Sequence, residues 1–185
     1  MSDVLWRRLN YFLSPQLDIY KHLAPRLQGK RVLEVGFGTG FGTLQLARYA
    51  EHIIAWESDD DAIGFARTAL PLSNVEWDYG DITVPQYHPE PEVVVMIEVL
   101  EHIEAYQLAL NNVAALLPYG GEFYMTARNA NADLRHNNLH QRELTARELY
   151  IMLIQYFNDV MFYDYEFREQ DDNTHITPIV AVAVK

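Results

Sequence analysis

Three glycines at alternate positions are the most distinctive chemical feature of the chain. Gly36, Gly38 and Gly40 directly follow the short apolar segment Arg31–Val35. Glycine lets the backbone bend sharply and approach a ligand without a Cβ in the way. The spacing is G-x-G-x-G, whereas the dinucleotide fingerprint G-x-G-x-x-G needs its third glycine where Phe41 stands. The loop therefore predicts a ligand site and argues against NAD or FAD.

Acidic residues lie close to this loop and to the ends of two further predicted strands. Glu34 precedes the glycines; it would repel a pyrophosphate but suits a ligand that carries a positive charge. Glu57 directly follows the predicted strand 52–56, where a carboxylate can accept both hydroxyls of a ribose. Asp81 can take an exocyclic amine of a purine while the N–H of Ile82 faces a ring nitrogen. Together these residues predict a nucleoside site.

A second polar group follows the most apolar segment of the chain. Residues 93–97 (VVVMI) predict a central strand buried on both faces, and Glu98, Glu101 and His102 come directly after it. The polar segment 128–141, which contains His140, follows the next predicted strand. Side chains of these types can orient an acceptor or take a proton from it. Both segments therefore predict the acceptor side of the site.

Strands and helices alternate along the chain and must position these groups. The predicted strands are residues 31–35, 52–56, 75–79, 93–97, 122–127, 160–166 and 176–184. The predicted helices are residues 17–27, opened by Ser14 and Pro15, then 41–49, 59–70 with Asp59 as cap, 105–117, and 145–156 with a Thr145 and Glu148 capping box.

This alternation predicts an α/β fold with a doubly wound, mostly parallel, seven-stranded sheet and helices on both faces. The last two strands are joined by a hairpin, which makes one of them antiparallel. We expect a single domain over residues 1–185, with an N-terminal helical lid (1–29) and a seven-stranded core (30–185).

Composition excludes several classes of protein. The chain has 185 residues, 49% of them hydrophobic, and a net charge of −12. It is too apolar for a disordered chain and too acidic to hold nucleic acid by its phosphates, and it has no apolar run that would span a bilayer. The absence of cysteine excludes disulfides, thiolate catalysis and Cys-ligated zinc. The N-terminus has no apolar signal core, so we expect a cytoplasmic protein.

Five of these motifs, in this order, resemble the class I S-adenosylmethionine-dependent methyltransferases, and the resemblance covers residues 31–185. The motifs are VLEVGFGTG at 32–40, Glu57, GDI at 80–82, EVLEH at 98–102 and LLPYGG at 116–121. The resemblance implies S-adenosylmethionine as cofactor and a Rossmann-like fold. It implies that the cofactor is bound by Glu34, Gly36, Phe37, Gly38, Gly40, Glu57, Ser58, Asp81, Ile82 and Glu98.

The resemblance also implies the reaction, which is transfer of a methyl group to an oxygen or nitrogen of a small molecule by in-line displacement. A sulfonium methyl is already activated, so the protein mainly supplies alignment and a dry site. His102, Glu101 and His140 are the candidate bases or acceptor-orienting groups. We expect no bound metal and no nucleic-acid or membrane partner.

Two alternatives differ from this reading. The pattern of Glu98, Glu101, His102 and His140 also resembles the metal-binding residues of the small-RNA terminal 2′-O-methyltransferases, where a divalent ion would polarise ribose hydroxyls. The net charge of −12 and the absence of an RNA-binding extension argue against it. The other alternative is a regulatory protein that binds S-adenosylmethionine without turnover.

Overall fold

The computed structural model describes residues 16–84, 90–132 and 143–185. The chain divides into two compact units, Met1–Asp81 and Ile82–Lys185. The predicted helix start at Ser14 and Pro15, and the candidate base His140, lie outside the described residues.

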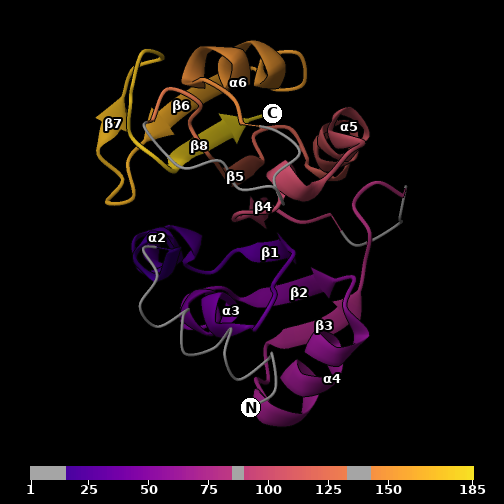
Figure 1. Cartoon of the computed structure of the whole chain (residues 1–185). Helices are drawn as coiled ribbons and strands as arrows, with labels where there is room; N and C mark the ends of the chain where they lie inside the picture. Colours follow the sequence, from indigo (N-terminus) through magenta and orange to yellow (C-terminus); the bar gives the residue numbers. More distant parts are fainter. Residues whose placement is uncertain (1–15, 85–89, 133–142) are drawn as a thin grey trace. The chain divides into compact units, whose positions relative to one another are not determined.

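The first unit contains three parallel strands in the order β3-β2-β1. They are β1 (Arg31–Val35), β2 (His52–Glu57) and β3 (Val75–Tyr79), and they lie side by side in indigo and purple in Figure 1. The bounds of β1 and β3 match the prediction, and β2 is one residue longer because Glu57 still pairs with the neighbouring strand. Parallel pairing brings the ends of β1 and β2 together at one edge, where the glycine loop and Glu57 lie.

The helices in the described part of the first unit are α2 (Gln16–Leu23), the 3₁₀ helix η1 (Ala24–Leu27), α3 (Phe41–Leu46) and α4 (Asp60–Ala69). The single helix predicted for residues 17–27 is wrong, because the chain changes from α to 3₁₀ at Ala24. Pro25 has no N–H to donate to the preceding turn, which ends the α-helical pattern. Asp59 caps α4 as predicted and accepts hydrogen bonds from the N–H groups of Asp61 (2.9 Å) and Ala62 (3.4 Å).

The described residues of the second unit form five strands in the order β4-β5-β8-β6-β7. They are β4 (Val93–Met96), β5 (Glu122–Ala127), β6 (Asp159–Tyr163), β7 (Glu169–Gln170) and β8 (Ile179–Val184). β4 and β5 are parallel, whereas β8 runs antiparallel to both of its neighbours, which confirms the predicted reversal near the C-terminus. The four residues of β4 are fully buried, as the almost wholly apolar sequence of residues 93–97 predicts.

The predicted number of seven strands is wrong, because the residues that the structure describes form eight strands, of which β7 is the additional one. It has only two polar residues and carries no alternating hydrophobic pattern by which a strand is recognised. The strand before it is also shorter than predicted. Asp164 ends β6 by accepting hydrogen bonds from the N–H groups of Glu166 (2.9 Å) and Arg168 (3.0 Å), which forms a turn.

The helices of the second unit are η2 (Leu100–His102), α5 (Tyr106–Leu116) and α6 (Ala146–Leu153). The predicted capping box of α6 is confirmed. The N–H of Glu148 donates to Oγ1 of Thr145 (3.2 Å), and the N–H of Thr145 donates to Oε2 of Glu148 (2.9 Å). The short helix η2 was not predicted, and it determines which residues of the EVLEH motif are buried.

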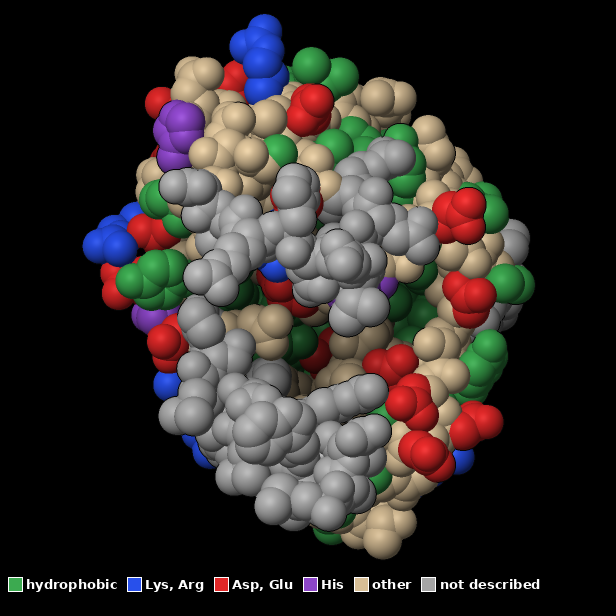
Figure 2. All heavy atoms as spheres, in the orientation of Figure 1, with side chains coloured by type: hydrophobic (Ala, Val, Ile, Leu, Met, Phe, Trp, Pro, Cys, Tyr) green, Lys and Arg blue, Asp and Glu red, His purple; other side chains and the backbone are tan. Residues whose placement is uncertain are grey.

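Side chains of Asp and Glu are more frequent than those of Lys and Arg on the face shown in Figure 2, in keeping with the net charge of −12. No helix in the described part of the chain combines the length and the hydropathy needed to cross a membrane.

Candidate functional site

The glycine loop between β1 and α3 adopts left-handed backbone conformations at each of its three glycines. The φ angles of Gly36, Gly38 and Gly40 are 75°, 56° and 76°. A side chain at Gly38 would meet no atom of the described residues within 4 Å, so this part of the loop is open toward them. A Cβ at Gly40 would lie 2.6 Å from Cδ1 of Leu70, so Gly40 is required for packing. The loop is therefore accessible at Gly38 and tightly packed against neighbouring side chains at Gly40.

Replacing Gly40 with Ala is expected to lower the free energy of unfolding by about 1–3 kcal/mol, because the new Cβ would overlap Leu70 in a strained backbone region. Gly64 is the matched control, since it lies inside α4 with no atom near its missing side chain. Gly64→Ala should stabilise the protein by about 0.5–1 kcal/mol. Urea unfolding of both variants measures the difference, and equal effects would contradict the packing argument.

Glu57 joins the end of β2 to the glycine loop. Its Oε2 accepts a hydrogen bond from the N–H of Gly38 (2.9 Å), and its Oε1 accepts from the N–H groups of Ser58 (2.8 Å) and Asp59 (3.3 Å). A carboxylate has about four acceptor positions, so Oε2 keeps room for a further donor such as a hydroxyl. The structure thus brings together two residues that the sequence predicted separately, Gly38 and Glu57.

Glu34 lies in the core of the first unit. Its side chain is fully buried, and the hydroxyl of Tyr20 donates to its Oε1 (2.9 Å). Burial raises the pKa of Glu34 to about 7, the hydroxyls of Thr43 and Tyr20 oppose the rise, and the charge of Glu57 adds to it. Its Oε2 accepts no hydrogen bond within the described ranges.

Tyr20 of α2 is a partner of this site that is not among the predicted site residues. Its ring occupies the space left by the absent side chain of Gly42, where a Cβ would lie 2.3 Å from Cζ of the ring. In the sequence, the only sign of this contact is the glycine at position 42, the second residue of α3. A second unforeseen contact is the edge-to-face packing of Phe37 on Trp77, with ring centroids 4.8 Å apart.

The GDI motif follows β3. The N–H of Gly80 donates to the carbonyl of Glu57 (3.1 Å), and a side chain at Gly80 would collide with Trp56. Asp81 is half-buried and ends the first unit, and Ile82 is buried in the second, where its carbonyl accepts from Nδ2 of Asn112 (2.8 Å).

A separate group of charged residues lies in the second unit, around η2 and the end of β5. Glu98 has a left-handed backbone (φ 57°) and is held by Thr126. The N–H of Glu98 donates to Oγ1 of Thr126 (2.7 Å), which in turn donates to Oε1 of Glu98 (3.1 Å). Thr126, the residue that determines this conformation, was not predicted, because its distance from Glu98 in the sequence is 28 residues.

Glu101 is buried, whereas its neighbour His102 is exposed. Burial, with the charge of Glu98 adding to its effect, raises the pKa of Glu101 to about 8, and Arg128 acts in the opposite direction. No group of three or more His, Asp or Glu side chains suited to a metal occurs among the described residues, which do not include His140.

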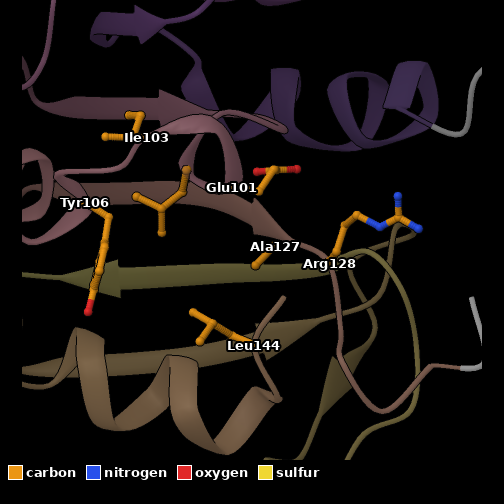
Figure 3. A pocket seen from close by; sticks show the side chains of 7 residues that line it. Glu101, Ile103, Tyr106, Ala127, Arg128 and Leu144 are labelled. Atoms are coloured by element: carbon orange, nitrogen blue, oxygen red, sulfur yellow. The ribbon is translucent and has the colours of Figure 1, made fainter. Parts of the chain in front are cut away.

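A small pocket of about 20 Å³ opens beside Glu101. In Figure 3 the charged ends of Glu101 and Arg128 lie toward one side of it and Tyr106 toward the other. Nε of Arg128 is 3.9 Å from Oε1 of Glu143. The lining residues are Leu100, Glu101, Ile103, Tyr106, Ala127, Arg128 and Leu144.

Comparison with known proteins adds a family to this geometry. A family model described as a methyltransferase domain matches residues 5–179. A probable S-adenosylmethionine-dependent methyltransferase of Mycobacterium tuberculosis is 30% identical over 151 residues, which cover 78% of this chain and 54% of that protein. The ubiquinone biosynthesis O-methyltransferase of Aeromonas salmonicida is 28% identical, with coverage of 63% and 50%. The chain thus spans about half the length of these curated relatives.

Solved structures share the fold. A Thermotoga maritima protein described as a S-adenosylmethionine-dependent methyltransferase, possibly a histamine N-methyltransferase, has a TM-score of 0.75 at 16% identity, and the match covers 98% of this chain and 95% of that one. The N-methyltransferase NodS of Bradyrhizobium japonicum, in complex with S-adenosylhomocysteine, has a TM-score of 0.63 at 18% identity, with coverage of 91% and 83%. These likenesses confirm the predicted Rossmann-like, mostly parallel α/β fold.

Proposed function

The chain belongs to the class I S-adenosylmethionine-dependent methyltransferase family, and on that premise we propose that it transfers a methyl group from S-adenosylmethionine to an oxygen or nitrogen atom of a small molecule. The observation that carries the proposal is the hydrogen bond from the N–H of Gly38 to Oε2 of Glu57. It places a carboxylate that can still accept further hydrogen bonds beside a stretch of backbone that a ligand can approach. The family match extends over both units, which supports a single methyltransferase domain over residues 1–185.

The residues of the first unit fit the chemistry of this cofactor. Glu57 would accept hydrogen bonds from the ribose hydroxyls through the free capacity of its Oε2. The open space at Gly38 lets the cofactor approach the backbone closely. The remaining predicted cofactor residues of this unit lie in the same loop or follow β2 and β3: Gly36, Phe37, Gly40, Ser58 and Asp81.

Charge supports the same assignment. S-adenosylmethionine carries a sulfonium and an ammonium, and acidic side chains near the site lower the free energy of such a ligand. Glu34 would contribute negative charge beneath the loop when it is ionised. When bound, the cofactor supplies an activated methyl group, whose bond to sulfur breaks as the bond to the acceptor forms. Ile82 and Glu98, the two predicted cofactor residues of the second unit, remain predictions.

The small-molecule acceptor is supported by the relatives. Their names include a ubiquinone biosynthesis O-methyltransferase and the N-methyltransferase NodS, so related chains serve both acceptor atoms. The net charge of −12 opposes binding of nucleic acid, which leaves the RNA-end alternative without support. In the described part of the second unit, Glu101 is the candidate proton acceptor that lines a pocket, whereas His102 is exposed.

The proposal is tested by two measurements on the full chain. Calorimetric titration with S-adenosylhomocysteine should show a single site, and radiolabelled S-adenosylmethionine should label members of a panel of phenols, alcohols and amines. Binding without product from any acceptor would favour the regulatory alternative. Absence of binding would overturn the proposed function altogether.

A further inference from the structure

Glu101 has an unusual environment for a carboxyl group. Its side chain is only 4% exposed, and neither carboxylate oxygen accepts a hydrogen bond from any N–H or O–H of the described residues. Buried polar groups in proteins are nearly always hydrogen-bonded, because an unpaired buried acceptor loses its interactions with water and gains nothing in return. Since Glu101 also lines the pocket, the missing donors can come from a ligand.

The neighbouring charges do not supply those donors. Arg128 is close enough to lower the pKa of Glu101, yet it gives no hydrogen bond to either oxygen, and its Nε lies 3.9 Å from Glu143. Glu98 adds a second carboxyl beside Glu101. When Glu101 is ionised, it and Glu98 place two carboxylates among the described residues here, against the opposing charge of Arg128. An ammonium ion is therefore attracted more strongly to the ionised form of Glu101 than to its neutral form.

The remaining lining residues and the volume of the pocket favour a ligand with a small polar group attached to an apolar hydrocarbon part. Leu100, Ile103, Ala127 and Leu144 contribute apolar side chains to the wall. The volume of about 20 Å³ is of the order of one water molecule, so it admits a single small headgroup but no ring.

We propose that this pocket binds the ammonium group of an aliphatic amine substrate, with Glu101 accepting its N–H groups. Ionised Glu101 then takes one of the N–H protons, and the nitrogen lone pair that this frees forms the bond to the methyl group as the methyl–sulfur bond breaks. The inference rests on the proposed function and specifies the atom that accepts the methyl group, which is nitrogen and not oxygen. An ammonium group has three donors and a positive charge, which match two unpartnered oxygens beside a second carboxyl. A hydroxyl offers a single donor, and a carboxylate is repelled.

Binding of a cation also has a consequence for protonation. Burial and Glu98 keep Glu101 largely neutral near pH 7, with Arg128 acting in the opposite direction. An ammonium ion beside Glu101 favours its ionised form. Binding of an amine should therefore release a proton, and calorimetry in two buffers of different ionisation enthalpy detects it.

The test uses the full chain, with and without S-adenosylhomocysteine, and three matched probe pairs: n-butylamine with n-butanol, isopentylamine with isopentanol, and phenethylamine with 2-phenylethanol. Phenylacetate is the anionic probe. We expect at least one amine to bind about tenfold or more tightly than its alcohol, with proton release, and phenylacetate not to bind. Alcohols that bind as tightly as their amines, or amines that do not bind, would overturn the proposal.

Variants locate the effect. Glu101→Gln keeps the shape but removes the charge and should abolish the preference for amines, whereas Glu101→Asp should restore part of it. Glu104→Gln is the matched control, because Glu104 is exposed on the same segment. Each variant should bind S-adenosylhomocysteine like the wild type. An amine preference that survives in Glu101→Gln overturns the amine site alone, whereas loss of S-adenosylhomocysteine binding in the wild type overturns the proposed function.

Discussion

Glu57→Gln is expected to weaken binding of S-adenosylhomocysteine by about 10- to 100-fold. Hydrogen bonds that involve a charged group contribute about 1.5–3 kcal/mol, and 1.4 kcal/mol corresponds to a factor of ten in affinity. The amide nitrogen of glutamine also cannot accept a hydrogen bond. One of the two N–H groups, that of Gly38 or that of Ser58, therefore loses its acceptor in the variant. Calorimetric titration of both proteins gives the ratio of dissociation constants.

Glu51→Gln serves as the control for Glu57→Gln. Glu51 is an exposed acid just before β2, so its replacement changes the net charge equally without touching the glycine loop. We expect it to leave binding unchanged. Thermal unfolding of both variants shows whether they are folded. Binding by a folded Glu57→Gln variant at wild-type strength would contradict the role given to Glu57.

Stability of the protein is expected to fall as the pH rises from about 5 to 8, and Glu34 is expected to account for about 3 kcal/mol of the fall. The pKa of Glu34 is about 7 in the folded chain against 4.5 as the ordinary value, and one pKa unit corresponds to about 1.4 kcal/mol. Because the folded pKa is the higher one, the stabilising contribution is complete below pH 4.5 and is lost as the pH rises through 7.

Urea unfolding at several pH values measures this effect. Glu34→Gln should show a shallower pH dependence over this range, since the amide does not ionise. The groups that face Glu34 are Tyr20, Thr43 and Glu57, and they remain in the variant. Glu101 contributes in the same direction in both proteins. An identical pH dependence in wild type and Glu34→Gln would refute the assignment.

Local chemistry explains why much of the fold was predictable. Mainly apolar segments predicted β1 and β5 at their observed bounds, and the alternation of apolar and acidic residues in VEWDY did the same for β3. Caps at Asp59 and Thr145 were also predictable, because an N-cap bond joins residues two or three positions apart. The errors, such as the two-residue β7 and the change to 3₁₀ at Ala24, concern elements too short to show a period.

The residue types of the candidate site could be predicted from the sequence, whereas the hydrogen bonds between them could not. The glycine loop and the acid at Glu57 follow from residue types and spacing, because the carboxyl ends of parallel strands meet at one edge of a sheet. That Glu57 uses part of its carboxylate to hold Gly38 depends on loop geometry, which pairing rules do not specify.

Sequence alone therefore determined the order of the elements, the loop type and the set of candidate acids, since these depend on neighbours along the chain. Tertiary structure decided the environment of each acid. Glu34 and Glu101 are buried and Glu57 is partly exposed, although all three are glutamates after or within apolar segments. Burial, together with Tyr20 beside Glu34 and Glu98 beside Glu101, sets the pKa values of these two buried acids, and those contacts come from residues that only folding brings together.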